Sequence, residues 1–199
     1  MKYRADAHAV EMAAPAQRGV FSKADLQTLL AEPHPAAFAR RYRALDANGV
    51  LRRFCRGFYV TESFDLPTLS QRIAPDSYVS FGTVLARELL IGPRPSRRVE
   101  AVKVGKSRTY AGLGYEVVHL HIAPHLAFGY EATDGVQFAD TEKAVLDVLY
   151  FHLRGRRYPF DIYSGIDFDK LDRVRLDSYL KLYRNPKFVT FARGLLELP

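Results

Sequence analysis

Residues 19–60 contain a close succession of helix start and stop signals, and this succession restricts what the chain can fold into. Ser22 is a good N-cap for a short helix over residues 23–30, and Asp25 at its third helical position gives an acidic variant of the capping box. Pro35 suits the first turn of a second helix, because the N–H that proline lacks has no helical partner there. The sequence therefore predicts two short helices that are separated by a brief turn.

The second helix is followed by a pattern typical of a β-hairpin. The helix should run over residues 35–47 and end at an Asn-Gly pair that tolerates positive φ. Two short extended runs follow, residues 50–54 and 58–60, and residues 56–57 supply the turn between them. With a further helix expected within residues 3–16, this order of elements is the plan of a winged helix-turn-helix domain.

The positive charge of the chain is concentrated in this unit. Lys and Arg total 29 against 22 Asp and Glu, which gives a net charge of +7. Residues 40–56 hold six arginines and one acid, Asp46, and so carry +5 of that charge. Such a local excess suggests a polyanionic partner. The alternative is a small helical unit whose exposed hairpin is merely solvated by its arginines.

One face of the second predicted helix is suited to the major groove of DNA. Phe38, Tyr42 and Leu45 share the opposite, apolar face, so Arg40 and Arg43 should point outward beside small alanines. Arginine in that place can pair bidentately with guanine, whereas arginines on the hairpin would meet the DNA backbone or the minor groove. The predicted DNA-contacting residues are Ser22, Lys23, Arg40, Arg41, Arg43, Arg52, Arg53 and Arg56.

A second domain follows a segment with two helix-breaking prolines. We expect residues 1–62 to form the DNA-binding domain, residues 63–76 to be a linker or connecting helix, and residues 77–199 to form the second domain. Apolar spacing and capping residues predict helices near residues 81–90, 140–153, 169–183 and 187–198, and strands near residues 99–104 and 115–122. The predicted fold class is therefore α+β: an N-terminal winged helix-turn-helix domain, then a mixed α+β domain with few strands and a helical tail.

Five stretches of the chain occur in an order that is known from one protein family. They read VFSKADLQTLL, RYRALDANGVLRRFCRGFYV, YVSFGTVLARELLI, FADTEKAVLDVLY and LKLYRNPKFVTFARGLLEL. In their order and spacing these stretches resemble the AbiEi-type antitoxins, which are also transcriptional regulators of abortive-infection (type IV) toxin–antitoxin systems. The resemblance covers residues 20–196, which is nearly the whole chain.

The resemblance implies two functions for one chain. The N-terminal domain would bind inverted repeats in double-stranded DNA upstream of its own operon, as an autorepressor. The C-terminal domain would counteract a nucleotidyltransferase-like toxin, a functional partner that it need not contact directly. The candidate antitoxin surface is a mixed-charge face on the last two predicted helices, which is also typical of a solvated helix: Lys181, Arg184, Lys187 and Arg193.

Residues that could carry catalysis or bind a metal are sparse. His119 and His121 would share one face of a strand, with His125 nearby, but no cysteine accompanies them and half-exposed strand histidines are common. Cys55 lies among arginines that could lower the pKa of its thiol, yet a catalytic thiol would also need a placed histidine. We therefore expect no enzymatic activity, no metal and no cofactor.

Two other functions stay open from the sequence. One is a plain winged-helix regulator whose second domain senses a ligand or dimerises, and the other is a metal-dependent nucleic-acid enzyme. The single cysteine, Cys55, excludes an internal disulfide and suits a reducing cytoplasm. No apolar run approaches the roughly 18 residues that span a bilayer, and residues 1–16 do not read as a secretory signal, so no membrane partner is expected.

Overall fold

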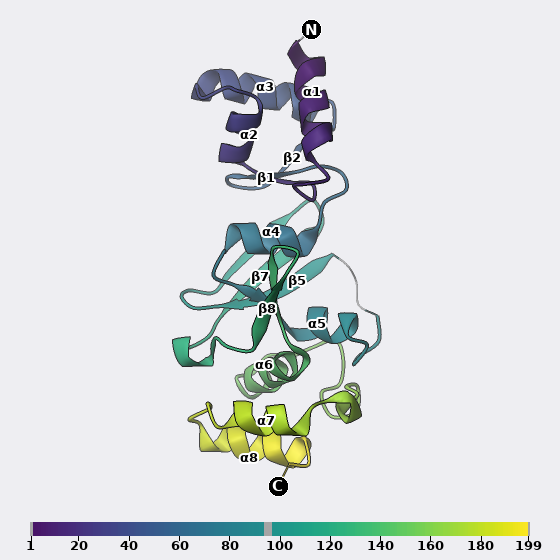
Figure 1. Cartoon of the computed structure of the whole chain (residues 1–199), viewed down its shortest axis with the longest axis vertical. Coiled ribbons are helices and arrows are strands. Elements are labelled where there is room, and N and C mark those ends of the chain that lie inside the picture. Colours follow the sequence, from purple (N-terminus) through teal and green to yellow (C-terminus); the bar gives the residue numbers. More distant parts are fainter. Residues whose placement is uncertain (1, 94–96, 199) are drawn as a thin grey trace.

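Two β-sheets organise the computed structural model, which describes residues 2–93 and 97–198. Within these ranges, the smaller sheet has three strands in the order β1-β3-β2, and the larger has six in the order β6-β7-β5-β4-β9-β8. The sheets follow one another along an elongated molecule, with the N-terminus at one end and the C-terminus at the other (Figure 1). The fold is α+β, as the sequence predicts.

The N-terminal unit consists of helices packed on the smaller sheet. Its elements are α1 (Lys2–Ala13), β1 (Val20–Ser22), α2 (Lys23–Leu29), α3 (Pro35–Ala47), β2 (Arg52–Cys55) and β3 (Phe58–Val60). Strand β3 is the central strand and pairs antiparallel with both of its neighbours. Phe21, Leu26, Leu45 and Leu51 are buried between the helices and the sheet, so this unit has a hydrophobic core of its own.

The ends of α2 and α3 follow the predicted capping residues. The Ser22 hydroxyl accepts from the Asp25 N–H at 3.1 Å, and the Asp25 carboxylate accepts from the Ser22 N–H at 2.7 Å, which completes the capping box. Pro35 is in the first turn of α3, and Gly49 follows the helix with a φ of +72°. The two short helices and the hairpin are therefore confirmed where the sequence predicts them.

The second unit is built on the larger, mixed sheet. Its strands are β4 (Tyr78–Val79), β5 (Arg98–Lys103), β6 (Arg108–Gly112), β7 (Tyr115–His121), β8 (Tyr130–Thr133) and β9 (Val136–Ala139). Its helices are α4 (Leu66–Ile73), α5 (Phe81–Arg87), α6 (Thr141–Leu153), α7 (Arg173–Leu180) and α8 (Pro186–Leu195), with 3₁₀ turns η1 (Pro124–Leu126) and η2 (Phe168–Lys170). In Figure 1, α4 lies above the sheet, α5 and α6 lie below it, and α7 and α8 form a further layer beneath α6. Among the helices in the described ranges, none is long and apolar enough to cross a membrane.

The expectation of few strands in the second unit is wrong. The sequence predicts two strands there, whereas six described segments pair into the larger sheet. The missed strands are short, and all four residues of β8 are exposed, so apolar alternation does not mark it. Strands β4 and β9 are parallel neighbours although a long stretch of chain separates them, and such pairing has no local signal in the sequence.

Two helices of the second unit are shorter than predicted. Helix α5 ends at Arg87 because Leu89 adopts a φ of +58° and the Leu90 N–H donates back to the Leu85 carbonyl at 2.8 Å. Helix α7 begins after the 3₁₀ turn η2, where the Asp172 side chain accepts hydrogen bonds from the first N–H groups of the helix. The helices predicted over residues 81–90 and 169–183 are therefore correct in type and wrong in extent.

The segment of residues 63–76 contains α4, which packs between the two sheets. Leu69 on this helix is fully buried in the core of the second unit, and Val20, Phe54 and Val60 of the smaller sheet join the same core. Strand β2 also meets β6, where a Cβ built on Gly112 would lie 2.4 Å from the Phe54 carbonyl oxygen. The two units are thus in direct apolar contact with one another.

Candidate nucleic-acid interface

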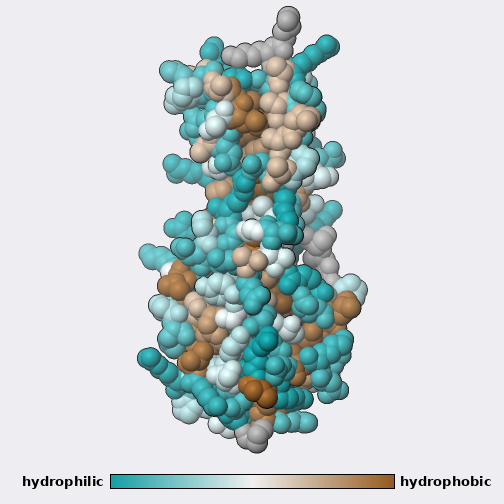
Figure 2. Space-filling model, viewed as in Figure 1, coloured by the Kyte–Doolittle hydropathy of each residue, from teal (hydrophilic) through white to brown (hydrophobic). Residues whose placement is uncertain are grey.

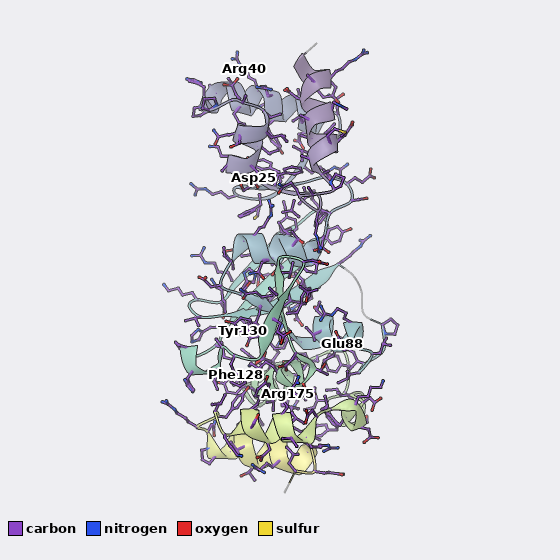
Figure 3. All side chains as sticks on the ribbon, viewed as in Figure 1. Asp25, Arg40, Glu88, Phe128, Tyr130 and Arg175 are labelled. Atoms are coloured by element: carbon purple, nitrogen blue, oxygen red, sulfur yellow. The ribbon has the colours of Figure 1, made fainter. Side chains whose placement is uncertain are left out.

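Helix α3 presents two arginines to solvent. Phe38 and Leu45 are buried beneath the helix, whereas Arg40 and Arg43 are exposed on its other side. Arg40 stands on the outer surface of α3 and points away from the rest of the molecule (Figure 3). Arg43 follows about one helical turn later on the same side. The arginine face predicted from helical periodicity is therefore present and accessible.

A groove of about 530 Å³ separates α3 from the β2–β3 hairpin. Its lining includes three exposed cations: Lys23 at the start of α2, and Arg53 and Arg56 on the hairpin. The Lys23 N–H donates to the Gly57 carbonyl at 2.8 Å and so joins the start of α2 to the hairpin turn. The fold thus gathers side chains from two distant segments around one groove.

Aromatic rings line the same groove. The Tyr42 and Tyr59 ring centroids are 4.7 Å apart in an edge-on arrangement, and Phe38 lies 6.4 Å from Tyr59. Burial, and next the charge of Asp46, raise the pKa of Tyr42 to about 12, so this phenol stays protonated at neutral pH. An uncharged, rigid interior with cations along its border is suited to a polyanion.

Arg41 is engaged within the protein and does not belong to this surface. Its Nε and Nη2 donate to the Asp6 carboxylate at 2.8 and 2.5 Å, and its Nη1 donates to the Leu30 carbonyl at 2.7 Å. The hydrogen bonds to Asp6 raise the pKa of Arg41 further. Of the predicted DNA-contacting arginines, Arg41 is thus one that pairs with an acid of its own unit, and its guanidinium joins α1, the end of α2 and α3.

Arg52 and Ser22 are not part of the groove beside α3. Successive residues of a strand point to opposite faces, and Arg52 accordingly lines a different pocket from Arg53, next to Tyr115 of the second unit. The Ser22 hydroxyl caps α2. The predicted DNA-contacting residues that are exposed on α3 or along the groove are Lys23, Arg40, Arg43, Arg53 and Arg56.

The histidines and Cys55 do not form a reactive cluster. Within residues 2–93 and 97–198, no three His, Cys, Asp or Glu side chains come together as a metal site. His119 is fully buried with its Nε2 2.9 Å from the Ser70 hydroxyl, while His121 and His125 are exposed. Burial raises the pKa of the Cys55 thiol and outweighs the opposite effect of a neighbouring arginine, so the expected lowering of that pKa is wrong.

The predicted antitoxin surface divides into two parts. Lys181 and Arg193 both bind the Asp177 carboxylate, the former at an N–O distance of 2.9 Å, and their hydrogen bonds lower the pKa of Asp177. Arg184 and Lys187 are exposed, in the turn after α7 and in the first turn of α8. Two of the four cations thus take part in an intramolecular ion-pair cluster, and the other two lie at the surface beside it.

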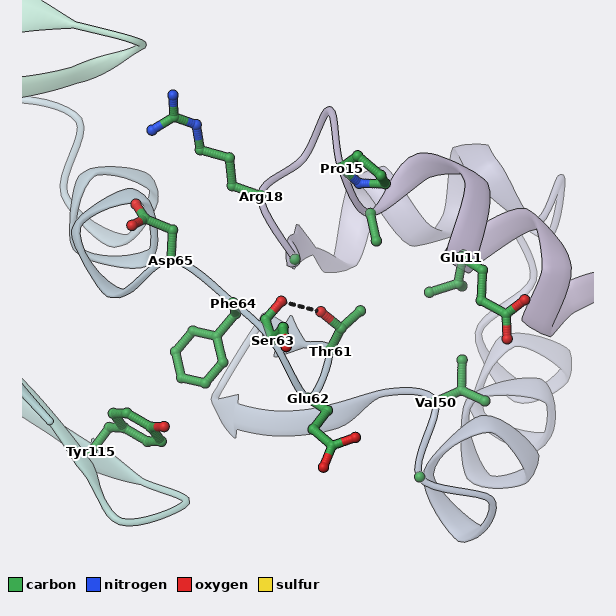
Figure 4. Close-up of a pocket in the computed structure, with 14 residues that line it drawn as sticks. Glu11, Pro15, Arg18, Val50, Thr61, Glu62, Ser63, Phe64, Asp65 and Tyr115 are labelled. Atoms are coloured by element: carbon green, nitrogen blue, oxygen red, sulfur yellow. Dashed lines mark hydrogen bonds between the residues drawn. The ribbon is translucent and has the colours of Figure 1, made fainter. Parts of the chain in front are cut away.

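A larger groove, which no sequence pattern predicted, lies between the two units. Its volume is about 910 Å³, and its lining comes from α1, from the loops before β1 and after β3, and from the start of β7. The Phe64 and Tyr115 rings line one side with centroids 5.0 Å apart, and the Thr61 hydroxyl donates to the Ser63 carbonyl at 2.8 Å (Figure 4). We call this the waist groove, since it lies where the space-filling outline of the molecule narrows (Figure 2).

Comparison with known proteins identifies a similar fold. No family model matches the chain, and no curated protein matches it in sequence. Solved structures do match, among them the crystal structure of the RV2827C protein from Mycobacterium tuberculosis. That match has a TM-score of 0.61 and 16% sequence identity, and it covers 94% of this chain and 74% of that one. At this level of identity, the similarity extends to the α+β fold of the chain and no further.

Proposed function

We propose that the N-terminal unit is a winged helix-turn-helix domain and that the protein is a DNA-binding transcriptional regulator. The observation that carries this proposal is the exposed arginine face of α3 beside a groove lined by Lys23, Arg53 and Arg56. The order α1-β1-α2-α3-β2-β3, with β3 between β1 and β2, supports it further. In the proposed domain, α3 is the recognition helix and the β2–β3 hairpin is the wing.

Two groups of cations have different roles in the proposed complex. Arg40 and Arg43 on α3 enter the major groove and contact base edges, where arginine pairs bidentately with guanine. Lys23, Arg53 and Arg56 contact phosphates, which orients the unit on the duplex without reading its sequence. Because each phosphate contact releases counterions, binding weakens steeply as the salt concentration rises.

Alanine substitutions separate these two roles. Arg53→Ala or Arg56→Ala should weaken binding to all sequences similarly and lower the slope of log K against log salt by about 1. Arg40→Ala or Arg43→Ala should cost about 1–3 kcal/mol on the preferred site and relax the preference at one base pair. The measurement is a mobility-shift titration at several salt concentrations, on duplexes that the wild type selects from a random library. Lys170→Ala, a charge loss in the second unit, is the matched control.

The proposed operator is an inverted repeat upstream of the protein's own operon. Two copies of the chain occupy facing half-sites, whose centres lie one helical turn apart, about 34–36 Å, or a multiple of that distance. Footprinting of the upstream region should therefore reveal two protected half-sites of opposite orientation. Protection of a single, unrepeated site would contradict this arrangement and leave the DNA-binding domain itself unaffected.

We propose on the sequence resemblance that the chain is also the antitoxin of a type IV toxin–antitoxin system. It acts in the cytoplasm, without a cofactor or catalytic activity, against a nucleotidyltransferase-like toxin that it need not contact. Arg184 and Lys187, with Lys181 and Arg193, are the proposed surface for this function. Co-expression with the toxin encoded beside it, scored by growth, tests the proposal, and a folded chain that gives no rescue would contradict it.

The waist groove favours a second candidate function, a regulator whose second domain senses a ligand. The lining of this groove comes mainly from the N-terminal unit and the segment after β3, with Tyr115 from the larger sheet, so a molecule bound there would contact the DNA-binding unit and β7 at once. Such a regulator represses its promoter and does not rescue cells from a toxin. A promoter reporter and a growth assay in one strain therefore separate the two candidates.

A further inference from the structure

Helix α4 is fastened to the larger sheet by three consecutive residues. Leu69 is fully buried in the core of the second unit. The Ser70 hydroxyl lies 2.9 Å from Nε2 of His119 on β7, and the Gln71 side-chain carbonyl accepts from the Gln137 N–H on β9 at 2.9 Å. These contacts reach three different parts of the second unit, so α4 is held in one orientation on its sheet.

The next residue, Arg72, reaches in the opposite direction, into the N-terminal unit. Its Nη1 donates to the Val20 carbonyl at 2.8 Å and to the Asp25 carboxylate at 2.7 Å. Its Nη2 donates to the side-chain carbonyl of Gln17. The three acceptors belong to the loop after α1, to β1 and to α2, so a single guanidinium holds three segments of the other unit.

The carboxylate that Arg72 binds is the one that caps α2. Oδ2 of Asp25 accepts from the Ser22 N–H at 2.7 Å as well as from Arg72. Lys23, which follows Ser22, lines the groove beside α3, and its N–H donates to the Gly57 carbonyl of the hairpin turn. Arg72 is therefore linked by two successive contacts to the start of α2 and to the turn of the hairpin.

We propose that Arg72 is a positioning residue for DNA binding: from the second unit, it holds the start of α2 and the hairpin turn in the geometry that a duplex requires. The inference rests on the proposed DNA-binding function and adds a residue that lies outside the N-terminal unit. A planar guanidinium with donors fixed in a fork is suited to this task, since it holds several acceptors in one arrangement. Without it, the Asp25 carboxylate keeps its hydrogen bond from the Ser22 N–H and loses the guanidinium that ties it to α4.

The test is a double-mutant cycle measured by DNA affinity. The variants are Arg72→Ala, Asp25→Asn, their combination, and Lys170→Ala as the charge-matched control, with a duplex that the wild type selects from a random library. Arg72→Ala should raise the Kd about tenfold, which corresponds to about 1.4 kcal/mol. The salt slope should stay that of the wild type, because no phosphate contact is lost. The Kd of the double variant should be no higher than that of the single variant with the higher Kd, since both substitutions break the same contact between Arg72 and Asp25.

Each other outcome overturns the inference in a distinguishable way. If the wild type selects no duplex, the proposed DNA-binding function fails, and the inference fails with it. If the wild type binds and Arg72→Ala binds equally well, only the role of Arg72 fails. A salt slope lower by about 1 in Arg72→Ala would make Arg72 a direct phosphate contact instead. If circular dichroism shows that Arg72→Ala is unfolded, the DNA affinities of Asp25→Asn and Gln17→Ala test the inference in its place. Wild-type affinity in both of these variants would overturn it.

Discussion

Arg41 holds together three elements of the N-terminal unit through its side chain alone. It is mostly buried, at 15% exposed, and its partner Asp6 is 6% exposed. Removing one member of a buried pair leaves the other charge without compensation, which is far more costly than losing a surface pair. The role of this arginine is thus set by its surroundings and differs from that of its neighbour Arg40.

Substitution of these two neighbours should separate stability from DNA binding. Arg41→Ala should lower the free energy of unfolding by roughly 3 kcal/mol, because the Asp6 carboxylate stays buried without its partner. Arg40→Ala should change that free energy by no more than about 0.5 kcal/mol, as is usual for exposed positions. Urea unfolding followed by circular dichroism measures both values. Equal losses in the two variants would contradict the assignment of Arg41.

His119 should make the stability of the protein depend on pH. Burial, and next the charge of Lys103, lower the pKa of His119 to about 4, against about 6.5 in the unfolded chain. Between these values the unfolded chain binds a proton that the folded chain excludes, so stability falls as the pH decreases from about 6.5 to 4. The total loss is roughly 3 kcal/mol, at 1.36 kcal/mol per pKa unit.

Unfolding by urea at pH 7 and pH 5 measures this dependence. In His119→Gln the loss of stability between pH 7 and pH 5 that this histidine causes should disappear. His121→Gln, a change at an exposed strand position, should still show that loss. If both variants lose stability with decreasing pH as the wild type does, His119 is not the group responsible.

At the scale of elements, a buried hydrogen bond from Ser80 to an ion pair within α6 joins this helix to the junction between β4 and α5. Lys143 and Asp147 are fully buried and bind each other, and the Ser80 hydroxyl donates to Asp147 at 2.8 Å. Ser80 is the N-cap residue of α5 but makes no capping hydrogen bond with its side chain. A buried carboxylate competes for the hydroxyl, because it is costly to bury without hydrogen bonds.

The end of α5 offers a test of backbone strain. Leu89 is 73% exposed and adopts a φ of +58°, a conformation that costs a residue with a Cβ about 1 kcal/mol or more. Leu89→Gly should therefore raise the free energy of unfolding by roughly 0.5–1 kcal/mol, even though glycine loses more entropy on folding. Leu89→Ala removes most of the exposed side chain, keeps the strain, and should give no such gain. Equal effects of the two substitutions in urea unfolding would contradict the strain argument.

At the scale of the whole molecule, the two units share more than a linker. Arg18 of the N-terminal unit binds Asp134 at the tip of the β8–β9 hairpin at 2.9 Å. Val20, Phe54 and Val60 contribute to the core around the larger sheet. A cut within α4 would remove its N-cap Asp65 and the buried Leu66, so the fold places the boundary for separating the units before this helix.

The stability of a C-terminal fragment should therefore depend on the residue at which the fragment begins. A fragment of residues 63–199 retains α4 and its cap and should melt cooperatively, although less stably than the full chain, because the apolar contacts of the smaller sheet are lost. A fragment of residues 69–199 lacks the first turn of α4 and should be further destabilised. Thermal melting followed by circular dichroism compares the two. If the shorter fragment is as stable as the longer one, α4 does not belong to the second unit as its packing indicates.

The two short helices and the hairpin of the N-terminal unit, and the exposed face of α3, could be predicted from the amino-acid sequence alone. Caps, prolines and the Asn-Gly pair act within a few residues, and helical periodicity alone sets Arg40 and Arg43 opposite the buried face. Three features depend on tertiary packing: which cations are already paired within the protein, the order of the strands in the larger sheet, and the contact of Arg72 with Asp25. The partners in these contacts are distant in sequence, by 35 residues for Arg41 and Asp6 and by 47 for Arg72 and Asp25. Local propensity carries no information over such distances, because these contacts form only once packing has brought the elements together.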